Sequence, residues 1–109
     1  MFQHIVDKTD CSHHVIFPGV DIFTTHGERL MLSLVEFQPL AVVEEHSHPH
    51  EQLGILLEGE GEFTVGDQTR HVRPGDVWRI PGGVPHKLVA GDRPVRAIDV
   101  FHPIREEYK

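Results

Sequence analysis

The chain has 109 residues, which is the size of one domain and leaves no room for two. Its formal net charge of −7 argues against binding to nucleic acid, which depends on Lys and Arg at the phosphates. The single cysteine, Cys11, excludes an intramolecular disulfide and a metal site built from several thiolates. The sequence shows no signal-peptide pattern and no stretch of roughly 18 apolar residues, so we expect a cytoplasmic protein that binds no membrane.

Turn residues recur along the chain at intervals that are too short for helices of average length. The segments between them read as strands, and in chain order they are 29–37, 52–57, 62–65, 69–73, 76–80, 86–90 and 95–101. Short strands at regular spacing are typical of a β-sandwich or barrel. We therefore predict an all-β fold, with one domain over 1–109 and a barrel core of about 29–102. The tail, 104–109, is the one segment that could form a helical turn.

Several of these predicted strands are apolar on both faces. The two faces of 52–57 are Gln52, Gly54 and Leu56 on one side, and Leu53, Ile55 and Leu57 on the other. A strand with one face in water should alternate more cleanly between apolar and polar residues. We expect the outer face to be covered by a second copy of the chain, which predicts a homodimer. The alternative is that the N-terminal segment 13–25 folds across the sheet, and the two are compatible.

The densest group of candidate metal ligands lies just before and within the second predicted strand. Side chains alternate faces along an extended strand, so His46 and His48 should point the same way, and Gln52 keeps that parity. Two imidazoles and an amide oxygen make three corners of a metal shell. His86, which opens a strand after a rigid Pro- and Gly-rich turn, is the candidate for the fourth corner. The sequence therefore predicts a site for one divalent metal ion.

Two spaced motifs that contain these residues resemble the motifs of the cupin family. The first cupin motif is His-x-His, three or four residues, Glu, six residues, Gly, and it reads here as His46, His48, Gln52 and Gly59. The second is Gly, five residues, Pro-x-Gly, two residues, His, and it reads here as Gly75, Pro81, Gly83 and His86. The resemblance implies a double-stranded β-helix, also called a jelly-roll barrel, with the metal held by the four predicted ligands.

The first motif departs from the family at Gln52, where Glu is usual. Glu51 is the alternative ligand if a bulge shifts the register, although the six-residue gap to Gly59 favours Gln52. His50 also shares the parity, but the rigid Pro49 before it is expected to turn it elsewhere. A neutral amide leaves one more positive charge on the metal, which favours Lewis-acid over redox chemistry. Such a site suits Ni²⁺, Zn²⁺, Mn²⁺, Fe²⁺ or Co²⁺.

The stretch at 46–52 and the C-terminal residues further resemble the small pectin-degradation cupins. That group linearises 4,5-unsaturated uronate monosaccharides from pectin or alginate into open-chain keto sugars. Its last strand and tail read Asp-Val-Phe-Ser-Pro, one residue, Arg and an acidic residue, and this chain has the corresponding stretch at 99–106 with His102 in place of Ser. The resemblance implies a sugar-acid substrate, with Asp99 as general acid and base, Arg105 on the substrate carboxylate and Phe101 as a pocket wall.

The residues themselves point to a site there, with alternatives. Asp99 shares the interior face with Phe101, and a buried carboxylate is costly unless it is paired or near a metal. It is either catalytic or in an ion pair with Arg105, which itself is either a carboxylate anchor or a solvated tail residue. Two further functions stay open: a binding or sensor cupin without turnover, and a metal-dependent oxygenase.

Overall fold

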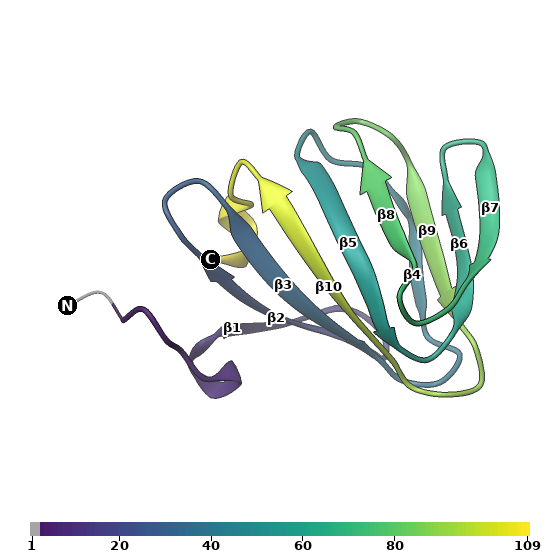
Figure 1. Cartoon of the computed structure of the whole chain (residues 1–109), viewed down its shortest axis with the longest axis horizontal. Helices are drawn as coiled ribbons and strands as arrows, with labels where there is room; N and C mark the ends of the chain where they lie inside the picture. The colour runs from purple at the N-terminus through teal and green to yellow at the C-terminus, as the bar shows by residue number, and fades with distance from the viewer. Residues whose placement is uncertain (1–2) are drawn as a thin grey trace.

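The computed structural model describes residues 3–109 and consists almost entirely of β-strands (Figure 1). The strands in chain order are β1 (Ser12–Phe17), β2 (Val20–His26), β3 (Met31–Phe37), β4 (Val42–His46), β5 (Glu51–Glu58), β6 (Gly61–Val65), β7 (Gln68–Val72), β8 (Val77–Ile80), β9 (His86–Ala90) and β10 (Val95–His102). Two single 3₁₀ turns, η1 (Lys8–Asp10) and η2 (Glu106–Tyr108), lie near the chain ends. In this part of the chain, no helix has the length and apolarity needed to cross a bilayer.

The strands form two antiparallel sheets that enclose one core. One sheet has the order β1-β2-β3-β10-β5-β8 and the other has the order β4-β9-β6-β7. Burial alternates along the strands, as in β9 and β10, because every second side chain points into the core between the sheets. The predicted all-β barrel is therefore confirmed. The β4–β5 and β8–β9 connections and η2 lie at the same end of the barrel, at the top in Figure 1.

All seven strands that the sequence predicts are present, with ends that differ by at most two residues. Strands β1, β2 and β4 were not predicted, because β1 begins with Ser and two His, β4 is short and ends with two Glu and a His, and β2 carries Asp and Thr among its apolar residues. The expectation that 13–25 folds across the sheet is wrong. Strand β2 pairs with β3 and β1 pairs with β2, so this hairpin extends the sheet edge and lies outside the predicted core of 29–102.

The outer face of the six-stranded sheet carries apolar side chains, as the two-faced strands of the sequence predict. Two cross-strand rows run over β3, β10, β5 and β8. We call their apolar members the outer patch: Leu32, Leu34, Leu53, Ile55, Val77, Ile98 and Val100. Within it Leu32, Leu53 and Val77 are 41%, 51% and 69% exposed. The sheet is thus apolar on both faces. The N-terminal residues Gln3, His4 and Val6 line a pocket together with Leu32 and Val100 at one edge of the outer patch, while Leu53 and Val77 stay exposed.

Candidate metal centre and pocket

Strand ends and one connection bring the four predicted ligands together at the open end of the barrel. His46 ends β4, His86 begins β9, and the two are register partners between these strands. Gln52 is the second residue of β5, and His48 lies in the connection before it. The expectation of one continuous strand with a single parity is therefore wrong, because β4 stops at His46 after a register irregularity. The residues converge from two sheets and a loop.

The three histidines can hold a metal ion, because one ring nitrogen of each lies within 4.8 Å of the others. Each Nδ1 sits 2.9–3.0 Å from a backbone carbonyl oxygen: that of Glu44 for His46, of His50 for His48 and of Val84 for His86. A carbonyl only accepts hydrogen bonds, so each Nδ1 carries the proton and each Nε2 presents a lone pair. The Nε2 atom of His86 is buried without a hydrogen-bond partner among the described residues. This set of donors fits a divalent metal ion.

Burial favours the neutral form of the His48 and His86 imidazoles. Desolvation is the main cause that lowers the pKa of His86 to about 4. Desolvation also lowers the pKa of His48, and the positive charge of Arg105 adds to the effect. Neutral imidazole is the form that binds a metal, so the two side chains need not lose a proton to become ligands at neutral pH.

The structure also distinguishes Gln52 from its alternatives. Gln52 is buried and its Oε1 lies 3.0 Å from Nε2 of His48, whereas Glu51 is exposed. The ring of His50 packs against His48 with centroids 5.7 Å apart, and His50 is not in the cluster of three close ring nitrogens. Gln52 is therefore the residue next to the histidines that can offer a fourth donor, as the family spacing implies.

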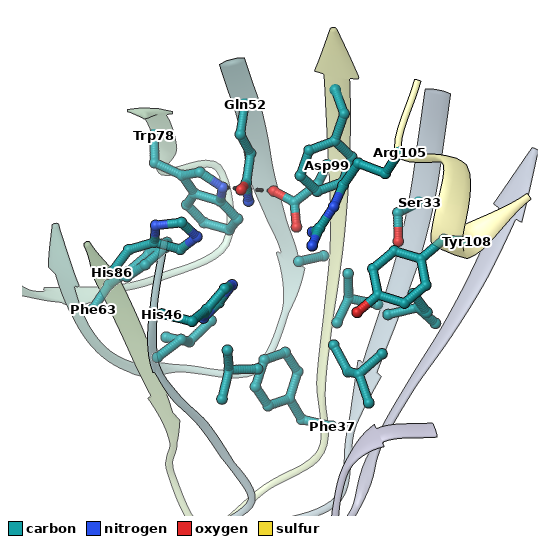
Figure 2. A pocket seen from close by; sticks show the side chains of 17 residues that line it. Ser33, Phe37, His46, Gln52, Phe63, Trp78, His86, Asp99, Arg105 and Tyr108 are labelled. Atoms are coloured by element: carbon teal, nitrogen blue, oxygen red, sulfur yellow. Dashed lines mark hydrogen bonds between the residues drawn. The ribbon is translucent and has the colours of Figure 1, made fainter. Parts of the chain in front are cut away.

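A pocket extends from the histidines into the barrel, and its polar groups gather on one side (Figure 2). The polar and charged side chains lining it include His46, Gln52, His86, Asp99 and Arg105. The rest of the wall is largely aliphatic and aromatic, with Phe37, Phe63 and Trp78 among its rings. A mainly apolar cavity with a few convergent polar groups is the usual form of a small-molecule site.

Asp99 lies deep in this pocket as a buried carboxyl group. Its Oδ1 accepts a hydrogen bond of 2.7 Å from Nε1 of Trp78, and the Gln52 side chain also bonds to it. Burial raises the pKa of Asp99 to about 6, against the opposing effects of these two hydrogen bonds and of the Arg105 charge. The alternative expectation, an ion pair between Asp99 and Arg105, is wrong. The Nε atom of Arg105 instead pairs with Glu107 at 3.0 Å.

Arg105 is not a solvated tail residue. Its side chain is 12% exposed, and its guanidinium carbon lies 5.1 Å from the ring centre of Phe101 and 4.6 Å from that of Tyr108. Figure 2 shows the guanidinium pointing into the pocket. Since Glu107 takes Nε, the two Nη groups remain for a ligand, and their fork matches a carboxylate.

Sequence reasoning missed Trp78 and Tyr108, which both line the pocket. The interior parity that Trp78 shares with Ile80 in the predicted strand 76–80 could have placed Trp78 in the core, but not beside Asp99. Tyr108 lies in η2, and its backbone carbonyl accepts a hydrogen bond from the Thr24 hydroxyl of β2. No local pattern predicts that contact, because it joins residues 84 positions apart.

Solved structures with the same fold include two close matches over nearly the whole chain. KdgF from Halomonas sp. is 30% identical with a TM-score of 0.81, over 87% of this chain and 90% of that chain. An RmlC-like cupin from Shewanella frigidimarina NCIMB 400 is 25% identical with a TM-score of 0.88, over 99% and 97%. Oxalate decarboxylase from Bacillus subtilis, at 21% identity and a TM-score of 0.83 over 94% of this chain and 30% of its own, shares the fold alone.

Among curated proteins, dimethylsulfoniopropionate lyase DddQ from Ruegeria pomeroyi is 41% identical over 54 residues. That segment is 49% of this chain but 27% of the lyase, so the match covers a minor part of that enzyme. The family model for the cupin domain matches residues 33–101, a range that includes both motifs and all four candidate ligands. The chain therefore belongs to the cupin family.

Proposed function

We propose that this chain is a metal-dependent enzyme that opens 4,5-unsaturated uronate monosaccharides to keto sugars. The observation that carries the proposal is that one pocket joins a cluster of three histidines, a buried carboxyl group and a largely buried guanidinium. These groups supply Lewis-acid, proton-transfer and anion-binding chemistry within a single cavity. The likeness of residues 46–52 and 99–106 to the pectin-degradation cupins, and the 30% identity to KdgF, support this choice of substrate.

The proposed metal site consists of Nε2 of His46, His48 and His86 with Oε1 of Gln52. The protonated Nδ1 atoms and the unpartnered Nε2 of His86 support it. When bound, a divalent ion supplies Lewis-acid chemistry that polarises a substrate oxygen. The same donor set is compatible with Ni²⁺, Zn²⁺, Mn²⁺, Fe²⁺ or Co²⁺.

Arg105 is proposed to bind the sugar carboxylate through its Nη groups. The guanidinium is held in place before substrate arrives. It lies against the aromatic rings of Phe101 and Tyr108, and it forms an ion pair with Glu107. A guanidinium that is already fixed loses little rotational freedom on binding. Phe101 also packs edge-on against His48, with ring centres 5.6 Å apart, so this wall connects the carboxylate anchor to the histidines.

Asp99 is proposed to move the proton. Ring opening removes the proton of the C1 hydroxyl and breaks the bond between C1 and the ring oxygen. This leaves an aldehyde at C1 and an enolate at the former ring oxygen, and the enolate gains a proton at C4 to become a ketone. The reaction is an isomerisation with no net gain or loss of protons. One group that takes the proton from the C1 hydroxyl and returns it at C4 is therefore sufficient. A carboxyl with a pKa of about 6 populates both forms near neutrality.

The test is to incubate purified, metal-loaded protein with an unsaturated uronate monosaccharide and to follow loss of absorbance from the conjugated double bond. We expect a rate above that in buffer, and a rate near the buffer value for Asp99→Asn. No rate above buffer for the wild-type protein overturns the proposal. Oxygen consumption would then point to an oxygenase, and a ligand-dependent melting shift without product would point to a binding or sensor cupin.

We also propose that the protein is a homodimer in which the outer patch is buried. The patch lies in the middle of the six-stranded sheet, and its exposed Leu32, Leu53 and Val77 make contiguous apolar surface of a kind that monomeric proteins rarely leave in water. A flat sheet face can pair with its own copy about a two-fold axis, the commonest symmetry of soluble oligomers.

A further inference from the structure

We propose that Trp78 is a positioning residue that orients the Asp99 carboxylate, and that Gly54 is required at its position because any side chain there would displace this contact. The inference rests on the proposed function, in which Asp99 moves the proton. It assigns roles to two residues at positions that the cupin motifs leave unspecified, Gly54 within the first motif and Trp78 within the second.

The three residues lie in one row across the six-stranded sheet. Asp99 of β10 is the register partner of Gly54 in β5, and Gly54 is the register partner of Trp78 in β8. Asp99 and Trp78 therefore face the interior from β10 and β8, which are separated by β5 and do not pair with each other. Nε1 of Trp78 nevertheless donates to Oδ1 of Asp99 at 2.7 Å, so the indole reaches across the middle strand.

Gly54 makes this reach possible. A Cβ atom at position 54 would lie 2.1 Å from Nε1 of Trp78 and 2.2 Å from Oδ1 of Asp99, which is in the path of the hydrogen bond itself. The φ angle of Gly54 is not positive, so a residue with a side chain could adopt the same backbone conformation. The need for glycine here is a need for space, not for an unusual backbone conformation.

The indole is well suited to orient a carboxyl group. Its N–H is a donor only, so it can bond only to an acceptor oxygen of Asp99. It engages Oδ1 of Asp99. Trp78 is itself fixed, being 7% exposed and packed edge-on against Phe63 with ring centres 4.9 Å apart. A carboxylate held by such a donor keeps one orientation.

The first experiment compares Trp78→Phe, which keeps an aromatic ring but removes the donor, with the wild-type protein in the uronate assay. We expect kcat to fall about 10- to 100-fold because the proton-transfer geometry is lost, and KM to stay within about twofold because Arg105 still binds the carboxylate. Ile80→Ala is the control. It removes a buried side chain from the same face of β8, and it should lower the melting temperature without lowering kcat at temperatures well below melting.

Gly54→Ala is the second variant, and it keeps the indole. We expect the same fall in kcat, together with a shift in the emission of Trp78, which is the one tryptophan of the chain. Because both substitutions break one contact, the double variant should be no slower than either single variant. Additive losses in the double variant, or kcat within twofold of wild type in Trp78→Phe, overturn the inference.

One measurement needs neither variant to be active. The single indole N–H gives one resonance in a spectrum of ¹⁵N-labelled protein, and we expect it to be protected from hydrogen exchange in the wild-type protein and to lose protection in Asp99→Ala. An unprotected wild-type indole overturns the inference whatever the enzyme does. An inactive wild-type protein with a protected indole overturns instead the proposed function and the catalytic meaning of the contact.

Discussion

Gln52 places its carbonyl oxygen 3.0 Å from Nε2 of His48, and its amide group bonds to Asp99. One neutral side chain therefore connects the histidine cluster to the buried carboxyl group. The glutamate that is usual at this place in the family could not do both, because a carboxylate has no hydrogen to donate to a second carboxylate. The substitution of Gln for Glu thus keeps like charges apart at the centre of the pocket.

Gln52→Glu should separate metal binding from catalysis. We expect the metal affinity to rise about tenfold, since a carboxylate is a stronger donor to a divalent ion than an amide. We expect kcat to fall, because the new charge repels Asp99 and the amide hydrogen bond is lost. Calorimetric metal titration and the uronate assay on the same preparation measure the two effects. A variant with both the affinity and the rate of wild type would contradict this account of Gln52.

His86→Ala should abolish stoichiometric metal binding, because it removes one of three ligand nitrogens from the cluster. Elemental analysis measures the metal content directly. In the wild-type protein, free metal at 100 times its dissociation constant should stabilise the fold by about 2.7 kcal/mol, and a chelator should reverse this. His71→Ala is the matched control, since His71 is exposed and pairs with Glu60 on the surface. Full metal content in His86→Ala would exclude the proposed centre.

Arg105→Lys should act mainly on substrate binding. Lysine keeps the positive charge but loses the planar fork that lies against Phe101 and Tyr108, so we expect KM to rise about tenfold with a smaller change in kcat. Initial rates over a range of uronate concentrations separate the two constants. Arg93→Lys, an exposed conservative change in the β9–β10 turn, should match the wild type. An unchanged KM in Arg105→Lys would remove Arg105 from the binding site.

Leu40→Gly should stabilise the protein. Leu40 is 69% exposed and has a φ angle of 65°, in the left-handed region that costs a residue with a side chain about 1–2 kcal/mol. Allowing for the larger backbone entropy of glycine, we expect a gain of about 1 kcal/mol in chemical denaturation. Leu30→Gly, at another exposed leucine without a positive φ, should instead lose about 0.5–1 kcal/mol. Equal signs for the two variants would refute the argument.

Leu53→Glu should convert the proposed dimer to a monomer, because it places a charge in the middle of the outer patch. Light scattering after size-exclusion chromatography should give twice the chain mass of 12.4 kDa for the wild-type protein and the chain mass for the variant. Leu40→Asn removes an exposed leucine outside the patch and should remain dimeric. A monomeric wild-type protein at micromolar concentration would rule the dimer out.

The sequence is enough to predict the fold class, seven of the ten strands in residues 3–109 and the four residues around the candidate metal centre. These follow from local patterns, since alternation sets the interior face of a strand and fixed spacing places ligands at strand ends. It did not determine β1, β2 and β4, where polar and acidic residues obscure the alternation.

The neighbours of Asp99 and Arg105 depend on the packing of the whole chain. The contact of Asp99 with Trp78 crosses a third strand and depends on the space at Gly54, and Arg105 rests on Tyr108, whose carbonyl is held by Thr24. Trp78 and Asp99 are 21 positions apart in the sequence, and Thr24 and Tyr108 are 84 positions apart. The periodicity of a segment says which face a side chain takes but not which strand is its neighbour, because strand order is set by the packing of the whole chain.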